Sequence, residues 1–98
     1  MSGLTRSSDG LDERRRRILF RAWHRGMREM DLILGNFANA EIETLSDPDL
    51  DAFEELLEPE DQTVFSWISG TEPIPPEYDT PLFAQIRAFH LSGRGLPD

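Results

Sequence analysis

Cysteine and lysine are absent from this chain of 98 residues, and histidine occurs only twice. The lack of cysteine excludes disulfides, thiolate metal sites and cysteine nucleophiles, and it fits a reducing compartment. No apolar run reaches the ~20 residues that a membrane-spanning helix needs, and the arginine-rich start has no apolar segment typical of a signal peptide. We therefore expect a cytoplasmic protein that does not insert into a membrane.

Residues suited to acid–base or metal chemistry are also few. His24 and His90 stand in no His-x-x-x-His or Glu-x-x-His arrangement, the spacings that place two metal ligands on one helix face. The carboxylates are numerous but scattered, as on the surface of an ordinary acidic protein. We expect no catalytic residue, no metal site and no enzymatic activity.

Charge is distributed unevenly along the chain. The net charge is −9, yet residues 1–30 carry eight arginines against four acids, whereas residues 31–98 carry two arginines against fifteen acids. Arginine recognises carboxylates and phosphates through paired hydrogen bonds, although the codon bias of a GC-rich genome explains the absence of lysine equally well. The acidic body would repel a phosphate backbone, so we do not expect nucleic acid as a partner.

Apolar residues recur at helical spacing in five segments, and no stretch alternates with the period of two typical of a strand. The segments cover about 11–25 and 28–43, and the later ones begin at Ser46 or Asp47, at Pro59 and at the pair Thr80–Pro81. We predict an all-α fold, a small compact five-helix bundle that forms a single domain over residues 11–92. Residues 1–10 and 93–98 are predicted to be flexible tails.

Two positions leave the local structure open. Gly35 weakens the middle of the second segment by up to ~1 kcal/mol, which makes a bend or an early end an alternative to a continuous helix. Trp67 is expected to be partly exposed, because Phe65 and Ile68 already supply the inner face of the fourth segment. An exposed tryptophan suggests a contact site, while a rim residue that covers the core is an equal alternative.

One face of the first segment is lined with arginine. Arg14, Arg17, Arg21 and Arg25 follow one another at spacings of three, four and four residues, so they project from the same side of a helix. This face could meet an acidic partner or a phosphate, which would make Arg17 and Arg21 additional contact residues. Alternatively, it is a solvated stripe that the chain's own acids neutralise.

The first two helical segments are joined by a short corner, residues 25–29. It consists of Arg25, Gly26, Met27, Arg28 and Glu29. A glycine between two helices makes a tight turn, and we expect the opposite charges of Arg25 and Glu29 to be exposed there. Either these charges pair within the chain and Gly26 is a helix cap, or the corner is a contact surface.

The corner belongs to a longer series of landmarks. Trp23 precedes it, an apolar stretch follows at 32–37, a Leu-Ser-Asp helix start comes at 45–47, and a Phe-x-Trp pair follows at 65–67. Together with the Arg-Gly-x-x-Glu pattern of the corner, this order resembles the flavinylation factors of succinate dehydrogenase, a family known in mitochondria as assembly factor 2. The resemblance covers most of the chain, from about residue 14 to residue 91.

The resemblance implies a five-helix bundle that binds the flavoprotein subunit of succinate dehydrogenase and, in bacteria, that of fumarate reductase. Such a factor promotes the covalent linkage of FAD to a histidine of this client. Carried over by position, Arg25, Gly26, Met27, Arg28 and Glu29 would form the client-binding surface. FAD would be the client's cofactor, with none stably bound here, and the free protein would be a monomer. The alternative is an acidic helical adaptor that binds another protein through the same corner and has no flavin role.

Overall fold

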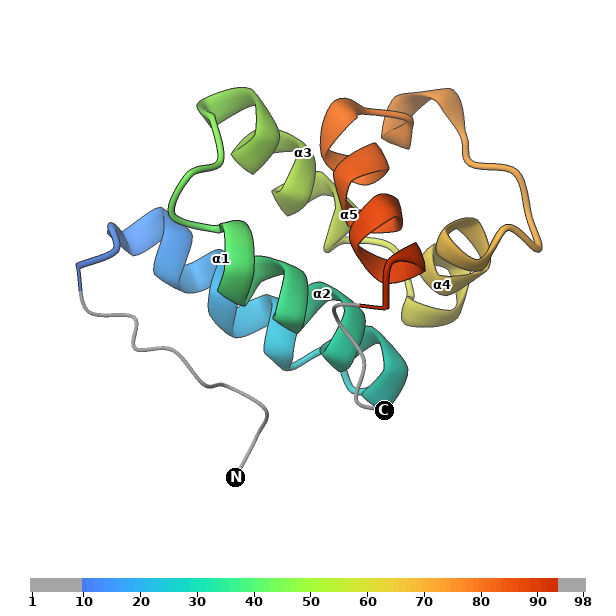
Figure 1. Ribbon diagram of the computed structural model, residues 1–98, viewed down its shortest axis with the longest axis horizontal. Coiled ribbons are helices and arrows are strands. Elements are labelled where there is room, and N and C mark those ends of the chain that lie inside the picture. The colour runs from blue at the N-terminus through green and yellow to red at the C-terminus, as the bar shows by residue number, and fades with distance from the viewer. Residues whose placement is uncertain (1–9, 94–98) are drawn as a thin grey trace.

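The computed structural model describes residues 10–93, and Figure 1 shows them as a bundle of short helices. Within these residues there are five α-helices, one 3-10 turn and no strand, so the predicted all-α five-helix fold is confirmed. The elements are α1 (Glu13–Trp23), α2 (Arg28–Glu41), α3 (Asp47–Leu56), α4 (Asp61–Ser69), η1 (Pro76–Tyr78) and α5 (Pro81–Leu91). Most of the two predicted tails, residues 1–9 and 94–98, lies outside the described residues.

Local sequence signals set most of the helix starts. Asp12, Ser46 and Thr80 are the N-caps of α1, α3 and α5, and each side chain accepts a hydrogen bond from the backbone N–H three residues later. These bonds satisfy donors that the first helical turn leaves without a partner. The predicted start of the fourth helix at Pro59 is wrong, because Glu60 is still extended and α4 begins at Asp61.

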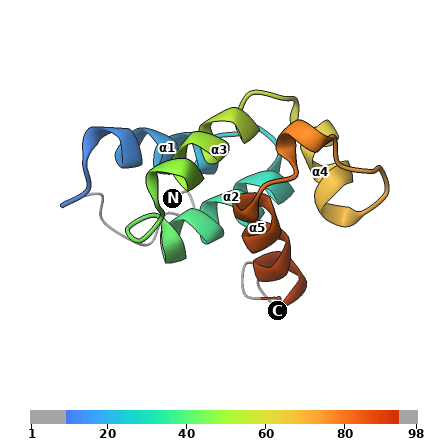
Figure 2. The same ribbon diagram turned by 90° about the horizontal axis from the view of Figure 1, so that it is seen from above.

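The helices pack around one apolar core. α1 and α2 lie side by side and antiparallel, while α5 packs against both α2 and α3 (Figures 1 and 2). Every helix contributes buried side chains to this core, and the largest fully buried ones include Phe37, Phe53, Ile18 and Ile68. The rings of Phe53 and Phe89 flank Phe37 at centroid distances of 6.0 and 5.7 Å. Because residues 25–29 connect α1 to α2, the corner lies at one end of this packed helix pair.

Gly35 does not bend or end α2, which continues to Glu41. The glycine is buried beneath the indole ring of Trp23, and a Cβ atom at this position would lie 2.6 Å from ring atoms Cε2 and Cε3. Trp23 is itself 4% exposed, and its Nε1 donates to Asn39 Oδ1 at 3.2 Å. Gly35 thus permits the close approach of α1 to α2, which offsets its poor helix propensity.

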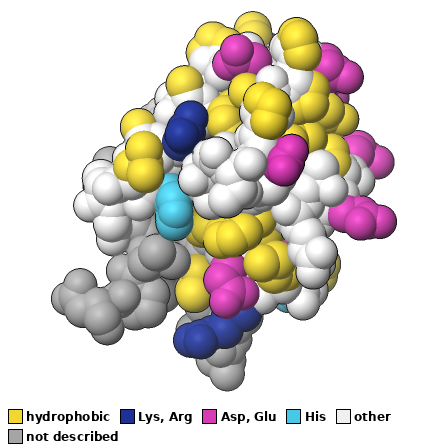
Figure 3. Space-filling view, turned by 90° about the vertical axis from the view of Figure 1, so that its right-hand side faces the viewer, with side chains coloured by type: hydrophobic (Ala, Val, Ile, Leu, Met, Phe, Trp, Pro, Cys, Tyr) yellow, Lys and Arg dark blue, Asp and Glu magenta, His cyan; other side chains and the backbone are white. Residues whose placement is uncertain are grey.

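The predicted partial exposure of Trp67 is wrong, because only 8% of this residue is exposed. Its ring stacks on Tyr78 of η1 at a centroid distance of 5.0 Å, so the proline-rich connection at 71–79 covers it. Phe65, which was expected to face inward, is only partly buried. Figure 3 shows this side of the molecule, where hydrophobic side chains lie among acidic ones. Trp67 is therefore a residue of the core.

Among the described residues, no helix is both long and apolar enough to cross a membrane.

Candidate functional site

The corner combines an unusual backbone with an exposed surface. His24 is the C-cap residue that follows α1, Gly26 has a φ of +102°, and Met27 is extended and precedes α2. Gly26 is exposed, and no atom lies within 4 Å of the position that a Cβ would occupy. A positive φ favours glycine because a side chain would crowd the backbone. The corner therefore presents bare backbone to the solvent.

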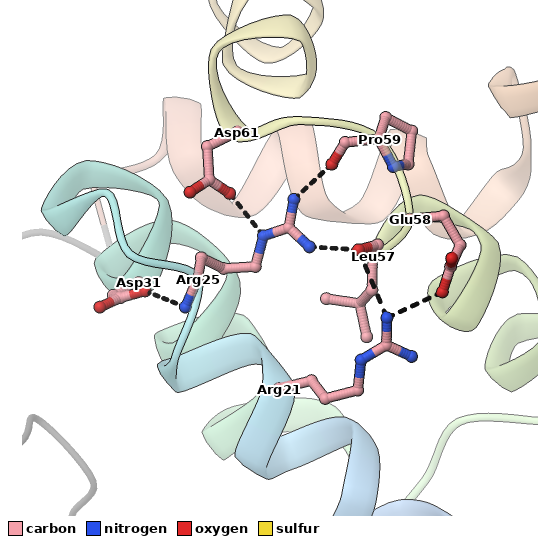
Figure 4. A network of polar contacts seen from close by, with 7 residues as sticks. All are labelled: Arg21, Arg25, Asp31, Leu57, Glu58, Pro59 and Asp61. Carbon is pink, nitrogen blue, oxygen red and sulfur yellow. Dashed lines mark hydrogen bonds and ion pairs between the residues drawn. The ribbon is translucent and has the colours of Figure 1, made fainter.

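The side chains of the corner point in different directions. Arg28 and Glu29 are exposed on the first turn of α2, and Met27 is partly buried against the core. Arg25, in contrast, extends toward the loop between α3 and α4, as Figure 4 shows. The expected exposure of Arg25 is thus wrong, whereas Glu29 is exposed as expected.

Three donors of the Arg25 guanidinium are used inside the protein. Nε donates to Asp61 Oδ1 at 2.5 Å, Nη2 donates to the Pro59 carbonyl at 2.6 Å, and Nη1 donates to the Leu57 carbonyl (Figure 4). The side chains of Arg25 and Asp61 are 10% and 15% exposed, so water screens this ion pair little. These contacts tie the corner to a loop that lies more than thirty residues away in sequence.

The backbone of the corner is held by Asp31. Its Oδ1 accepts a hydrogen bond from the Arg25 N–H at 2.7 Å, while its own N–H donates to the Met27 carbonyl at 2.9 Å. This role of Asp31 was not predicted from the sequence. An acid in the first turn of a helix is a signal that could have revealed it, because such side chains reach back to free N–H groups.

The arginine face of α1 is neutralised by the chain's own acids. Arg14 pairs with Asp51 and Glu54, Arg21 with Glu58 at 2.8 Å, and Arg17 more loosely with Glu13 at 3.6 Å. The Arg21 guanidinium also donates to the Leu57 carbonyl at 3.5 Å. Hydrogen bonding from Arg14 lowers the pKa of Glu54 below its ordinary value. Of the two interpretations of this face, internal neutralisation therefore describes the free protein.

An exposed aromatic pair next to the corner was also missed. Phe20 is 61% exposed and stacks on His24 with ring centroids 3.9 Å apart. The Nδ1 atom of His24 lies 2.6 Å from the Phe20 carbonyl, which fixes the imidazole against the helix. No hydrophobic periodicity could have revealed this pair, because Phe20 faces away from the core.

The structure thus brings Gly26, Arg28 and Glu29 to one exposed corner, with Phe20 close by on α1. Trp67 lies in the core, and Arg17 and Arg21 remain on the flank of α1. The described residues contain no group of three or more histidines and acids that could hold a metal ion. Gly26, Arg28 and Glu29 are the members of the corner that are open to solvent.

Comparison with known proteins gives a consistent match. The model of the family described as "Flavinator of succinate dehydrogenase" matches residues 16–90. The chain is 38% identical over 80 residues to "FAD assembly factor SdhE" of Acetobacter pasteurianus, covering 82% of this chain and 73% of that protein.

Mitochondrial relatives match over a smaller share of their length. The protein "Succinate dehydrogenase assembly factor 2, mitochondrial" of Mycosarcoma maydis is 34% identical over 73 residues, which cover 74% of this chain and 31% of the relative. The protein of the same name in Dictyostelium discoideum is 31% identical over 77 residues, which cover 79% of this chain and 55% of the relative. All three matches include most of the helical bundle. The chain therefore belongs to the family described as the flavinator of succinate dehydrogenase.

Proposed function

We propose that this protein is an assembly factor that binds the flavoprotein subunit of succinate dehydrogenase and promotes the covalent attachment of FAD to it. The observation that carries the proposal is the exposed corner, where the family's Arg-Gly-x-x-Glu pattern occupies the turn between α1 and α2. The names of the relatives, a FAD assembly factor and two succinate dehydrogenase assembly factors, support it. We refer to the flavoprotein subunit as the client.

The factor would act by orientation and would supply no reacting group. Flavin chemistry belongs to the cofactor, and aligning two reacting groups alone removes much of the barrier to their reaction. A binding protein achieves this when it prefers the client conformation in which those groups are aligned, because only differential affinity shifts an equilibrium. We therefore propose that the protein is not an enzyme.

The corner is suited to such a contact by shape and by charge. The bare backbone at Gly26 allows a partner to approach closely, and the exposed Arg28 and Glu29 can form charge-assisted hydrogen bonds. We propose that Gly26, Met27, Arg28 and Glu29 meet the client, with Phe20 at the edge of the contact. Arg25 belongs to the same corner, although its guanidinium already has internal partners.

We propose that FAD remains the client's cofactor and is not stably bound here. Arginines that could attract a pyrophosphate are engaged by carboxylates of this chain, as at Arg14 and Arg21 of α1 and at Arg25 of the corner. The flavoprotein subunit of fumarate reductase, which is chemically related, is a second proposed client. We further propose that the free protein is a monomer and acts in the cytoplasm.

Co-purification tests the binding step. A tagged form of this protein is expressed in its own cells and recovered with its partners, in parallel with a Glu29→Ala variant. We expect the wild type to recover the flavoprotein subunit, identified by mass spectrometry, and the variant to recover much less of it at equal expression. Recovery of some other protein through the same corner would instead support the acidic adaptor.

A further inference from the structure

Arg25 differs from the rest of the corner in what it contacts. Gly26, Arg28 and Glu29 are exposed, whereas the Arg25 side chain is 10% exposed and has three internal acceptors. A guanidinium with these partners would have to give up Asp61 and two carbonyls before it could bind a client. Exchanging internal bonds for external ones yields little net affinity. A direct contact is therefore a poor explanation of why the motif contains arginine.

The corner itself has few other restraints. Gly26 has positive φ and no neighbour within 4 Å of its Cβ position, and Met27 at the N-cap of α2 makes no capping hydrogen bond with its side chain. A glycine in such a setting gives a flexible turn. Besides the packing of Met27 against the core, two polar contacts counteract this flexibility: Asp31 holds the Arg25 N–H, and the Arg25 side chain anchors its own backbone to the α3–α4 loop (Figure 4).

The geometry of the anchor requires arginine. Its acceptors are a carboxylate at the start of α4 and carbonyls at positions 57 and 59, and each is reached by a different nitrogen of the guanidinium. The fork of a guanidinium presents donors in fixed directions, whereas a lysine has a single ammonium nitrogen. Lysine at this position would keep the charge but lose the simultaneous contacts.

We propose that Arg25 is a positioning residue, which acts through Asp61 and the 57–59 backbone to hold Gly26 and Glu29 in the orientation that the client meets. Asp61, a residue outside the corner and mostly buried, thereby becomes part of the client-binding machinery without touching the client. This inference rests on the proposed function, since it assigns a role within that same contact. It predicts that loosening the anchor weakens binding by reducing the fraction of molecules with a competent corner.

The decisive variant is Asp61→Asn, which keeps the size of the side chain and removes its charge. If the competent fraction falls to about one tenth, the apparent Kd for the client rises about tenfold. A direct contact between Arg25 and the client predicts the opposite direction, because Asp61→Asn would free the guanidinium and leave the Kd unchanged or lower it. Arg25→Lys should also weaken binding, and the double variant should show less than the sum of the two effects.

Glu54→Gln is the matched control. Like Asp61→Asn, it replaces a carboxylate that pairs with an arginine distant in the sequence, here Arg14. The Arg14–Glu54 pair lies at the opposite end of α1 from the corner. All variants are first compared by circular dichroism and thermal unfolding, so that affinities are measured only on folded protein. The control should leave the Kd within about twofold of the wild type, since surface pairs contribute little.

The experiment combines two measurements. Amide hydrogen exchange on the free protein should show faster exchange at residues 25–29 in Asp61→Asn than in Glu54→Gln, and titration of the purified flavoprotein subunit of succinate dehydrogenase should show the Kd increase. An unchanged or lower Kd for Asp61→Asn, or unchanged exchange at the corner, would overturn the positioning role. Failure of the wild-type protein to bind the subunit at all would instead overturn the proposed function, and with it the client-binding part of the inference.

Discussion

Replacing Gly35 by alanine should destabilise the protein, although alanine is the better helix former. In an exposed helix the change would gain about 1 kcal/mol. Here the added Cβ would lie 2.6 Å from two ring atoms of Trp23, well inside van der Waals contact. The indole ring cannot move aside easily, because it is 4% exposed and its Nε1 is bonded to Asn39.

The two opposing terms set the size of the effect. Overpacking a core typically costs about 1–3 kcal/mol, and a Cβ placed 2.6 Å from two atoms of a held ring puts the cost near the upper end of that range. Subtracting the gain in propensity of about 1 kcal/mol from about 3 kcal/mol leaves a net loss of about 2 kcal/mol. For a domain of this size each 1 kcal/mol lowers Tm by roughly 4–8 °C. Gly35→Ala should therefore lower Tm by roughly 8–16 °C, measured by thermal unfolding followed by circular dichroism.

A second variant isolates the contact with Trp23. In a Trp23→Leu background the smaller side chain leaves space beside Gly35, so adding Gly35→Ala should be neutral or stabilising there. The pair of measurements forms a double-mutant cycle with a coupling of about 2 kcal/mol or more. An increase in Tm for Gly35→Ala in the wild-type background would show that helix propensity governs this position and that the contact with Trp23 does not.

Three further predictions concern the surface. Gly26→Asn should raise the Kd for the client at least about tenfold while the domain stays folded, since a side chain covers the bare backbone. Gly10→Asn is the control, because Gly10 has a similar positive φ of +88° and open space around it, and it should leave the Kd unchanged. Equal Kd values for the two variants would contradict this prediction. Glu54→Gln should be less stable than the wild type near pH 7, as measured by urea titration. The difference in stability should shrink as pH falls below the ordinary Glu pKa of 4.5, because a carboxylate with a lowered pKa in the folded state contributes stability that is lost when it is protonated. A difference that persists at low pH would argue against the Arg14–Glu54 pair as its source. Phe20→Ser should change the free energy of unfolding by less than about 0.5 kcal/mol yet weaken client binding in a titration, and unchanged affinity would remove the aromatic pair from the contact.

The helices could be predicted from the sequence because their signals are local. The apolar spacing of each segment and caps such as Ser46 and Thr80 act within one or two turns, and the structure confirms them. Pro59 misled the prediction because proline favours a first helical turn, yet Glu60 is still extended and α4 begins only at Asp61.

The features that were missed depend on contacts between distant parts of the chain. Trp67 is buried because Tyr78 stacks on it from beyond a proline-rich connection, which no helical periodicity describes. Gly35 is tolerated because Trp23 on the neighbouring helix fills the space above it. The anchor of Arg25 joins residues 36 positions apart. The pattern at 25–29 could identify the corner, but only the structure separates its exposed members from the inward-facing arginine.

The rate of covalent flavin attachment would show whether this protein is a flavinylation factor. Purified apo-flavoprotein subunit is incubated with FAD and a dicarboxylate, with and without this protein, and the fluorescent band is followed through denaturing electrophoresis. We expect the band to form faster with the wild type and with Gly10→Asn, but not with Gly26→Asn. No acceleration by the wild type, with a client shown to accept FAD under other conditions, would contradict the proposed function.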